Sequence, residues 1–331
     1  MRVARYAVAT DPGRRRRRNE DAYVLEPPLF AVADGMGGAQ AGEVASKLAA
    51  GALREGDAGA LEERIQEANR RVHQRSLEDP EASGMGTTIT VAVVDGGVVQ
   101  FGHVGDSRAY LVREGRLEQL TQDHSLVGEL VRSGKLSREE AERHPQRSVI
   151  TRAVGTDPDV DVDTFAIEPH AGDVFLLCSD GLTDMVDDAS IERLVEEKRR
   201  DLDALVKALV KAANRGGGDD NITVVAFEIA GDDDGRDGED ELEETAVVPA
   251  AQAAAQRDPD EEDTLDEHDG VPVVDTTDTM VVSAEELRAA YESEQQAAAP
   301  PRRRRSDGRL LAFVLLVVVV LVLLTLWGLS R

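Results

Sequence analysis

Short apolar runs, bounded by glycine, aspartate and proline, fill the first 230 residues together with longer segments of helical periodicity. The expected strands and short apolar runs are 3–10, 22–26, 29–33, 87–94, 98–104, 109–113, 117–120, 160–168, 174–179 and 222–229, and the expected helices are 39–55, 61–77, 191–197 and 202–214. Strands and helices come in separate groups rather than in strict alternation. This order favours antiparallel sheets covered by helices over a doubly wound parallel sheet.

The segment that follows has a different composition. Residues 231–300 hold 23 acidic residues and three arginines, with almost no aromatic side chains. Such a segment cannot bury enough apolar surface to offset chain entropy, so we expect a disordered linker over 231–309 and one folded domain over 1–230. The whole chain of 331 residues has a net charge of −27, and the folded part is itself acidic. No nucleic-acid partner is therefore expected, and Arg14–Arg18 is interpreted as one functional arginine with solvated neighbours.

A run of 20 uncharged, largely apolar residues occupies positions 310–329. As a helix it is about 30 Å long, which matches the hydrocarbon core of a bilayer and exceeds most buried core helices. Arg302–Arg305 and Arg309 precede the run, and only Ser330 and Arg331 follow it. The positive-inside rule then predicts a single-pass transmembrane helix in the cell membrane with the folded domain in the cytoplasm.

Several chemistries are excluded by the absence of their motifs. The sequence has no G-x-x-x-x-G-K-[ST], G-x-G-x-x-G, H-E-x-x-H or G-x-S-x-G pattern. Its single cysteine, Cys178, has no nearby arginine to bind a phosphate, which argues against a cysteine nucleophile, and its side chain is expected to pack in the buried core. The six histidines do not show metal-ligand spacing.

Aspartate recurs instead at the ends of apolar runs, usually beside glycine. Asp34, Asp106 and Asp180 each end such a run, and Asp220 precedes the last one. One aspartate of this kind is typical of a turn. Four together favour a site for a hard cation, because carboxylate oxygens suit Mg²⁺ or Mn²⁺ and glycine lets the backbone approach closely. A carboxylate-rich site of this kind suggests two metals acting on a phosphoryl substrate.

Six short motifs occur in order over residues 1–230. They are R-x-x-N-E-D at 16–21, D-G-M-G-G at 34–38, G-M-G-T-T at 84–88, G-D-S-R at 105–108, S-D-G at 179–181 and D-D-N-I-T at 219–223. In order and spacing they resemble the metal-dependent protein phosphatases of type 2C, the PPM family. H-P-Q-R-S at 144–148 and Met36 are similar to its bacterial branch. The linker and the membrane span resemble phosphatases that partner membrane-bound Ser/Thr kinases.

The resemblance implies an α+β fold, a four-layer α/β/β/α sandwich of two antiparallel sheets flanked by helices. It also implies hydrolysis of phosphoserine and phosphothreonine in proteins by a metal-activated water, with two Mn²⁺ or Mg²⁺ ions and a third in bacterial members. The implied site residues are Asp34 bridging both metals, the Gly35 carbonyl on one, Asp180 and Asp220 on the other, Asp21 acting mainly through water, Asp106 and Asp180 with Ser148 at the third metal, and Arg16 on the substrate phosphate.

Two positions depart from the family pattern. Met36 replaces a histidine of eukaryotic relatives that is thought to protonate the leaving group, so that role is unassigned in this chain, with metal-bound water as the default. Asp219 replaces a common proline and either tightens metal binding or caps a turn; the turn is favoured. Residues 121–156, the flap, are polar with a helical tendency, and Asp123 and His124 there either meet substrate or lie on a solvated surface.

Two other function classes stay open beside the phosphoprotein phosphatase. One is a catalytically inactive binding module on the same fold, which the complete ligand set disfavours. The other is a hydrolase of small phosphate esters, which nothing in the sequence excludes. The linker also contains two similar five-residue sequences, E-T-A-V-V at 244–248 and D-T-M-V-V at 278–282. The similarity is either chance in a segment of biased composition or marks a pair of phosphorylation sites at Thr245 and Thr279.

Overall fold

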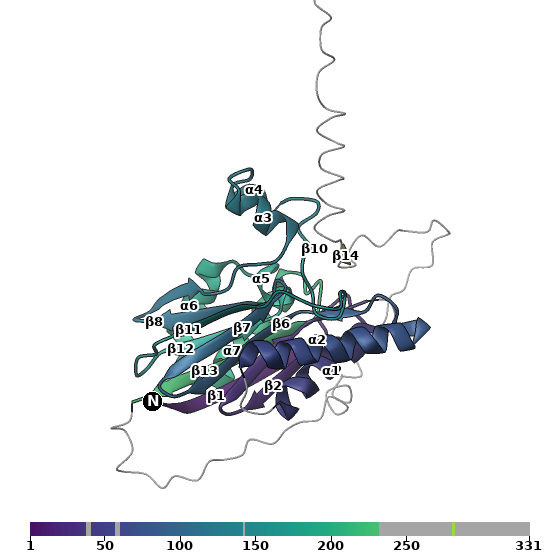
Figure 1. Ribbon diagram of the computed structural model, residues 1–331. Coiled ribbons are helices and arrows are strands. Elements are labelled where there is room, and N and C mark those ends of the chain that lie inside the picture. Colours follow the sequence, from purple (N-terminus) through teal and green to yellow (C-terminus); the bar gives the residue numbers. More distant parts are fainter. Residues whose placement is uncertain (38–40, 57–59, 142, 232–279, 282–331) are drawn as a thin grey trace, which may run out of the picture. The chain divides into compact units, whose positions relative to one another are not determined.

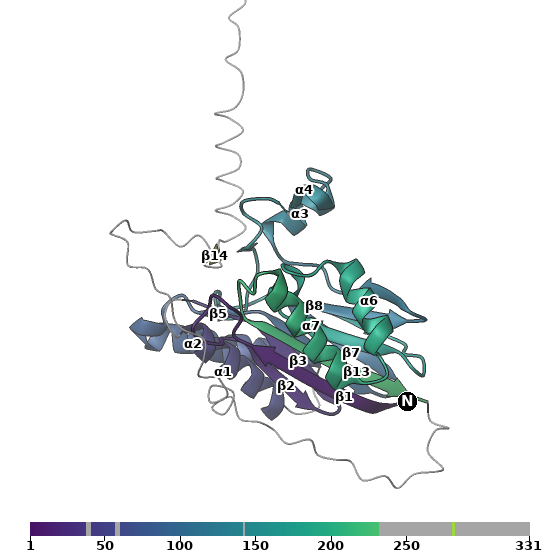
Figure 2. The ribbon, with the colours of Figure 1, turned by 180° about the vertical axis from the view of Figure 1, so that it is seen from behind.

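The computed structural model describes residues 1–37, 41–56, 60–141 and 143–231, and the backbone of 280–281. These residues form two antiparallel sheets face to face, with helices on the outer side of each sheet (Figures 1 and 2). The expected four-layer sandwich is therefore confirmed. Within the described ranges no helix is both long and apolar enough to cross a membrane. The expected span at 310–329 and nearly all of the expected linker lie outside those ranges.

The first sheet has the strand order β1-β13-β12-β8-β9. Its strands are β1 (Arg2–Asp11), β8 (Arg108–Arg113), β9 (Arg116–Gln119), β12 (Val174–Cys178) and β13 (Ile222–Ala230). β13 pairs with β1 on one side and with β12 on the other, so residues from the two ends of the folded part are neighbours in this sheet. β12 and β13 are buried along almost their whole length because both of their faces are covered.

The second sheet has the strand order β11-β7-β6-β3-β2. Its strands are β2 (Ala22–Glu26), β3 (Leu29–Ala33), β6 (Ile89–Asp95), β7 (Val98–Val104) and β11 (Asp163–Ile167). β6 and β7 are joined by a hairpin turn in which Gly96 and Gly97 both have positive φ, at 57° and 87°. The D-G-G turn signal at 95–97 thus marks a real reversal of the chain.

The space between the sheets is filled by aromatic and branched side chains. Phe30 of the second sheet stacks on Phe227 of the first, with ring centroids 4.3 Å apart, and Phe175 lies 5.1 Å from Phe227. Along β12 the side chains alternate: Phe175 and Leu177 enter this central core, whereas Leu176 and Cys178 face the helices. Cys178 is buried and unpaired, as expected.

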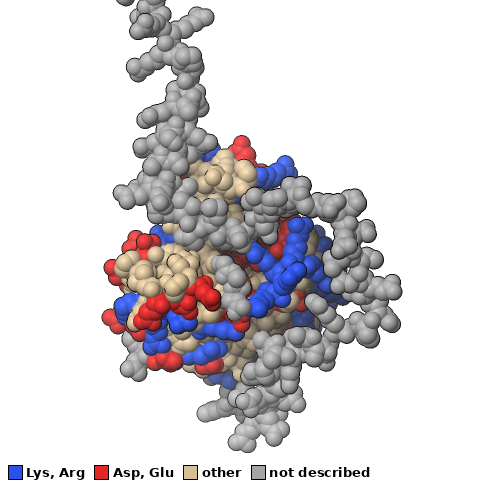
Figure 3. Space-filling model, turned by 90° about the vertical axis from the view of Figure 1, so that its right-hand side faces the viewer, with Lys and Arg blue, Asp and Glu red and all other residues tan. Residues whose placement is uncertain are grey.

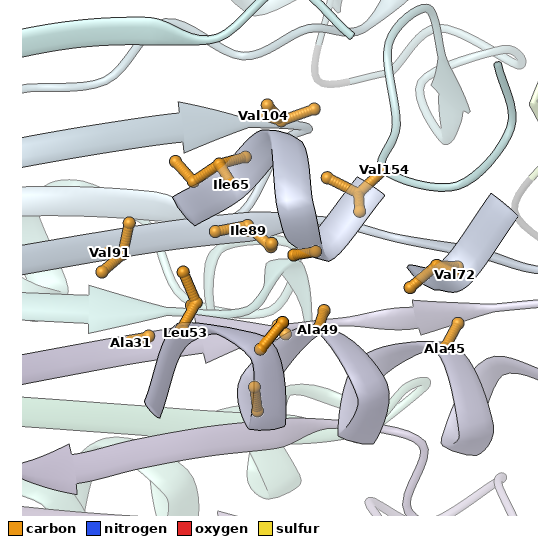
Figure 4. Packing of buried hydrophobic residues seen from close by; sticks show 14 of the residues in the cluster. Ala31, Ala45, Ala49, Leu53, Ile65, Val72, Ile89, Val91, Val104 and Val154 are labelled. Carbon is orange, nitrogen blue, oxygen red and sulfur yellow. The ribbon is translucent and has the colours of Figure 1, made fainter. Parts of the chain in front are cut away.

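Two helices cover each sheet. α1 (Ala41–Glu55) and α2 (Leu61–Glu78) pack on the second sheet, and α6 (Asp188–Lys198) and α7 (Leu202–Gly216) pack on the first. The inward face of α1 is lined by small residues, among them Ala45 and Ala49, which lets the helix lie close to the strands (Figure 4). α7 begins at Asp201, whose side chain accepts a hydrogen bond from the N–H of Ala204.

The remaining elements are short and surround one edge of the two sheets. They are β4 (Gly35–Met36), β5 (Gly86–Thr87), the 3-10 helix η1 (Pro80–Ala82), α3 (Leu126–Arg132), α4 (Arg138–Ala141), α5 (Asp180–Thr183), β10 (Val149–Ile150) and β14 (Met280–Val281), which pairs in parallel with β10. None of the described residues of α3 and α4 is buried, and these helices project from the sheets in Figure 1. The polar flap is therefore an excursion from the sandwich.

Candidate active site

The five predicted aspartates lie at the same edge of the two sheets. Asp21 precedes β2 and Asp34 follows β3, and these strands pair antiparallel. Asp180 follows β12 and Asp220 precedes β13, which also pair antiparallel. Asp106 follows β7, which runs in the same direction as β3 because both pair antiparallel with β6. The topology thus brings together side chains that are nearly 200 residues apart in the sequence.

Asp34 lies at the centre of this group, and its backbone is fixed by two threonines. Its N–H donates to Thr88 Oγ1 at 3.0 Å, and its carbonyl accepts from the Thr88 N–H at 2.9 Å and from Thr87 Oγ1 at 2.8 Å. Thr88 Oγ1 lies 2.7 Å from Ser107 Oγ. The G-M-G-T-T and G-D-S-R motifs are therefore joined to Asp34 by hydroxyl groups, which orient the carboxylate.

The neighbouring Gly35 lies where no side chain fits. A Cβ at this position would stand 2.1 Å from the carbonyl oxygen of Gly42 and 2.6 Å from that of Glu20. Contacts this short cannot be relieved by a rotamer change because both atoms are backbone. Glycine leaves only main-chain groups at position 35, which agrees with the carbonyl ligand that the resemblance implies.

Asp21 is buried, and hydroxyl groups donate hydrogen bonds to one of its two carboxylate oxygens. Its Oδ2 accepts from Ser179 Oγ at 2.9 Å and from Thr223 Oγ1 at 2.6 Å, whereas its Oδ1 has no hydrogen-bond partner. Burial raises the pKa of Asp21 to about 7, although the two hydroxyls oppose that rise. Ser179 and Thr223 lie within the motifs S-D-G and D-D-N-I-T, but no role was predicted for either side chain.

Asp34, Asp106 and Asp180 also have raised pKa values. Burial raises the pKa of Asp34 well above its usual range, and the charges of Asp21 and Asp180 add to the effect. Burial and the charge of Asp106 do the same to the pKa of Asp180. The pKa of Asp106 rises to about 7, first through burial and then through nearby acids. The negative charges of these aspartates are therefore not balanced by a cation within the group.

These features fit divalent cations. One oxygen each of Asp21, Asp106 and Asp180 is buried without a hydrogen-bond partner, and such atoms are costly unless a proton or a cation meets them. The atoms that these aspartates can offer to a metal are all oxygens, which suits Mg²⁺ or Mn²⁺. Among the residues that the structure describes, no three His, Cys, Asp or Glu side chains are arranged to hold a metal ion on their own. Each ion would therefore need backbone or water oxygens as well, as Mg²⁺ commonly does.

Arg16 and Asp220 are paired. Arg16 Nη2 donates to Asp220 Oδ2 at 2.9 Å, and the Asp220 Oδ1 accepts from the N–H of Asn221. Next to them, Arg15 Nε lies 2.8 Å from Asp219 Oδ1. Asp219 thus forms an ion pair with the arginine run, a role that neither sequence interpretation included. Figure 3 shows a face on which basic side chains gather next to acidic ones.

A cleft of about 260 Å³ opens between the flap and the acidic edge. Its lining residues are Arg143, His144, Pro145, Arg147 and Ser148 from the flap, and Asp180, Gly181, Asp184, Met185, Asp219 and Asp220 from the sandwich. Ser148 therefore shares the cleft with Asp180, and its assignment as a third-metal ligand stays a prediction. Arg147 Nε lies 3.4 Å from Asp184 Oδ2 and links the two walls. The cleft combines cationic side chains with carboxylates, a suitable lining for a phosphate ester.

Three further sequence interpretations concern individual residues. Met36 is buried in a small cluster with Ile150 and Ala153, where it packs beneath the flap. His103 is fully buried in β7, as expected for a packing role. Asp123 and His124 do not line the cleft: Asp123 is partly exposed and pairs with Arg108 at 2.7 Å, and His124 is only 4% exposed. The solvated surface was wrong for His124, because a polar run can be buried by partners distant in sequence, and contact of either residue with substrate stays a prediction.

Asn221 fixes the loop that carries Arg16. Its Nδ2 donates to the carbonyls of Pro12 and Arg18 at 3.0 and 2.8 Å, and its Oδ1 accepts from the N–H of Glu20 at 2.7 Å. One buried side-chain amide thus supplies hydrogen-bond partners to three backbone groups of this irregular segment. The sequence motif contained this residue, but its spacing could not reveal which loop it serves.

Comparisons with known proteins agree with this arrangement. Residues 14–217 match the family Protein phosphatase 2C, and the chain belongs to that family. It is 41% identical over 245 residues to the serine/threonine phosphatase stp of Listeria monocytogenes serotype 4b, covering 69% of this chain and 97% of that protein.

Solved structures show the same fold. The Mycobacterium tuberculosis serine/threonine phosphatase PstP/Ppp matches with a TM-score of 0.65 and 39% identity, covering 69% of this chain and all of that one. A catalytic domain of PstP in complex with 2 manganese ions matches with a TM-score of 0.64 and 37% identity, covering 70% of this chain and all of that one.

Proposed function

We propose that this chain is a metal-dependent phosphatase that hydrolyses phosphoserine and phosphothreonine in proteins. The observation that carries the proposal is the convergence of five aspartates at one sheet edge, three of them with a buried oxygen that lacks a hydrogen-bond partner. The cleft beside them is open to a side chain presented on a peptide and is lined by flap arginines. The relative from Listeria monocytogenes, 97% of which aligns with this chain, is named a serine/threonine phosphatase, which supports protein substrates.

Asp34, the Gly35 carbonyl, Asp180 and Asp220 would hold two Mn²⁺ or Mg²⁺ ions, with Asp21 acting through water. When bound, the ions supply an activated water for attack on phosphorus and stabilise charge on the phosphate oxygens. Asp106 and Asp180, with Ser148, would hold a third ion. The cations would also offset the repulsion between the acids, which adds to burial in raising the pKa values of Asp34 and Asp180.

Arg16 would bind the substrate phosphate. Its planar guanidinium fits two phosphate oxygens, and it already lies beside Asp220, one of the five aspartates at the edge of the sheets. The side chain of Met36 has no proton to give, and its burial with Ile150 and Ala153 assigns it to packing. Protonation of the leaving alkoxide would therefore fall to water at the site.

The first test is the metal dependence of phosphopeptide hydrolysis by the full chain. We expect phosphothreonine peptides to be hydrolysed in Mn²⁺ and hydrolysis to stop after EDTA, because the carboxylate cluster alone repels phosphate. Release of phosphate is measured with peptides and with small phosphate esters in parallel. Activity confined to small esters would support a metabolite hydrolase, and no turnover of either substrate in Mn²⁺ or Mg²⁺ would support a binding module.

The proposal extends to the membrane. The uncharged run 310–329, preceded by Arg302–Arg305 and Arg309, would anchor the protein with the phosphatase domain in the cytoplasm, where it would oppose membrane Ser/Thr kinases. We expect the full chain to stay in bacterial membranes washed with high salt and alkaline carbonate. Protease added to inverted vesicles should remove the domain. Extraction by either wash would contradict an integral span and leave the catalytic proposal unaffected.

A further inference from the structure

His124 lies where the chain leaves β9 and enters the flap. Its backbone N–H donates to the carbonyl of Gly105 at 2.8 Å, and its own carbonyl accepts from the N–H of Thr151 at 2.8 Å. Gly105 belongs to the G-D-S-R motif, and Thr151 follows β10 at the end of the flap. The backbone of His124 therefore bridges the active-site loop and the returning arm of the flap.

The imidazole adds a second contact to the same loop. Its Nδ1 lies 3.0 Å from the backbone nitrogen of Gly105, which has a hydrogen to donate. Nδ1 must then be the acceptor, so the proton of the neutral ring resides on Nε2, which lies 3.2 Å from Asp163 Oδ2 and 3.0 Å from Arg152 Nη1. Because the Arg152 guanidinium can only donate, Asp163 is the acceptor for both groups, with Oδ2 facing the imidazole and Oδ1 facing Arg152. Burial and the nearby charge of Arg152 lower the pKa of His124, which favours this neutral form.

Gly105 is thereby held at both of its main-chain polar groups by one residue. Its φ is +108°, and a Cβ there would lie 2.6 Å from the Cβ of Thr88, so no residue with a side chain fits at this position. The next residue is Asp106, which is buried and has one carboxylate oxygen without a hydrogen-bond partner. The direction of that oxygen depends on the backbone that His124 holds.

We propose that His124 is a positioning residue that aims the Asp106 carboxylate at the third-metal position and couples that loop to the end of the flap. The coupling runs through Asp163, which also accepts from Arg152 Nη1 at 2.7 Å. This inference rests on the proposed metal-dependent function, but it concerns a contact outside the metal ligands. It gives a physical role to a histidine within the polar segment 121–125.

Two substitutions separate the two ring nitrogens. Asparagine carries an oxygen near the position of Nδ1, so His124→Asn keeps an acceptor for the Gly105 N–H. Glutamine reaches the position of Nε2 instead, so His124→Gln keeps a partner for Asp163 and loses the acceptor for Gly105. His73→Asn is the matched control, because His73 is a half-buried histidine that contacts the backbone of Gly155 instead.

The measurements are Mn²⁺ binding by calorimetry and amide hydrogen exchange over 105–107 in EDTA, both on the full chain. We expect His124→Gln to weaken the weakest-bound Mn²⁺ about tenfold, a typical loss when a group that orients a metal ligand is removed. Exchange at Gly105 should be faster in that variant only. His124→Asn and His73→Asn should stay within about threefold of wild type on the same scale.

Equal behaviour of His124→Asn and His124→Gln would overturn the proposal, because a merely structural histidine has no reason to distinguish the two nitrogens. Wild-type Mn²⁺ affinity and exchange in His124→Gln would overturn it as well. The exchange measurement needs no metal and no turnover. It therefore decides the role of His124 even if the wild-type protein proves to have no phosphatase activity.

Discussion

Asp34→Asn is expected to lower the turnover number by about three orders of magnitude or more, since losing several kcal/mol of metal-dependent stabilisation has that effect on a rate. Asp34 is the residue whose carboxyl group feels the charges of Asp21, Asp106, Asp180 and Asp220 together, so it lies at the centre of the cluster. An amide keeps the shape of the side chain and removes the charge that two cations would share. Phosphopeptide hydrolysis at saturating Mn²⁺ is the measurement.

The control for this change is Asp159→Asn, which removes a charge from an exposed aspartate. It should leave turnover and thermal stability unchanged. The Asp34→Asn protein should melt close to wild type in EDTA, because its backbone hydrogen bonds to Thr87 and Thr88 do not involve the carboxylate. More than a tenth of wild-type activity in a folded Asp34→Asn protein would rule out a two-metal site centred on this residue.

Arg16→Ala is expected to lower kcat/KM by about tenfold to a hundredfold, the range for losing a charged hydrogen bond of roughly 1.5–3 kcal/mol. Arg16 is partly buried at the site and pairs with Asp220. Because it would contact phosphate in the ground state and in the transition state, KM should rise and kcat should fall. Steady-state kinetics with a phosphothreonine peptide separate the two constants.

Arg14→Ala provides the comparison within the same arginine run. The Arg14 side chain is exposed, and its backbone N–H bonds to the carbonyl of Gly218, a contact that alanine keeps. We expect little change in either kinetic constant. If Arg14→Ala and Arg16→Ala reduced kcat/KM equally, the run would act through diffuse attraction of an anionic substrate, and the assignment of Arg16 to a specific phosphate contact would be wrong.

The sequence predicted the sandwich well where apolar runs have clear boundaries. β2 and β3 occupy the expected residues, and β7 does as well, because each is enclosed by proline or glycine turns. α7 extends only two residues beyond the expected end at Asn214. These elements are specified by local pattern and by burial of one or both faces.

Short elements were not predictable in the same way. β4 and β5 each have two residues, and their pairing depends on Gly35 meeting Thr87 across more than 50 positions of sequence. α3 and α4 bury no side chain, so they leave no apolar stripe to detect. Local composition cannot encode an element whose stability comes from distant contacts.

The candidate site shows the same division. Asp34 and Asp180 could be predicted because aspartate beside glycine at a strand end is a local signal, and Asp220 because it shortly precedes an apolar run. The hydroxyls of Ser179 and Thr223 could not, because their function is to bond a carboxylate about 158 and 202 positions away. The metal-ligand assignments themselves remain predictions that the proposed metal titrations test.

The position of β13 in the first sheet has a consequence for synthesis on the ribosome. β13 comprises residues 222–230, yet it lies between β1, the first strand made, and β12. A nascent chain that ends before residue 220 leaves both neighbours without their shared partner and lacks Asp220. Activity should therefore switch on abruptly as β13 emerges, so an arrested or prematurely terminated chain would not release a partly active phosphatase into the cell.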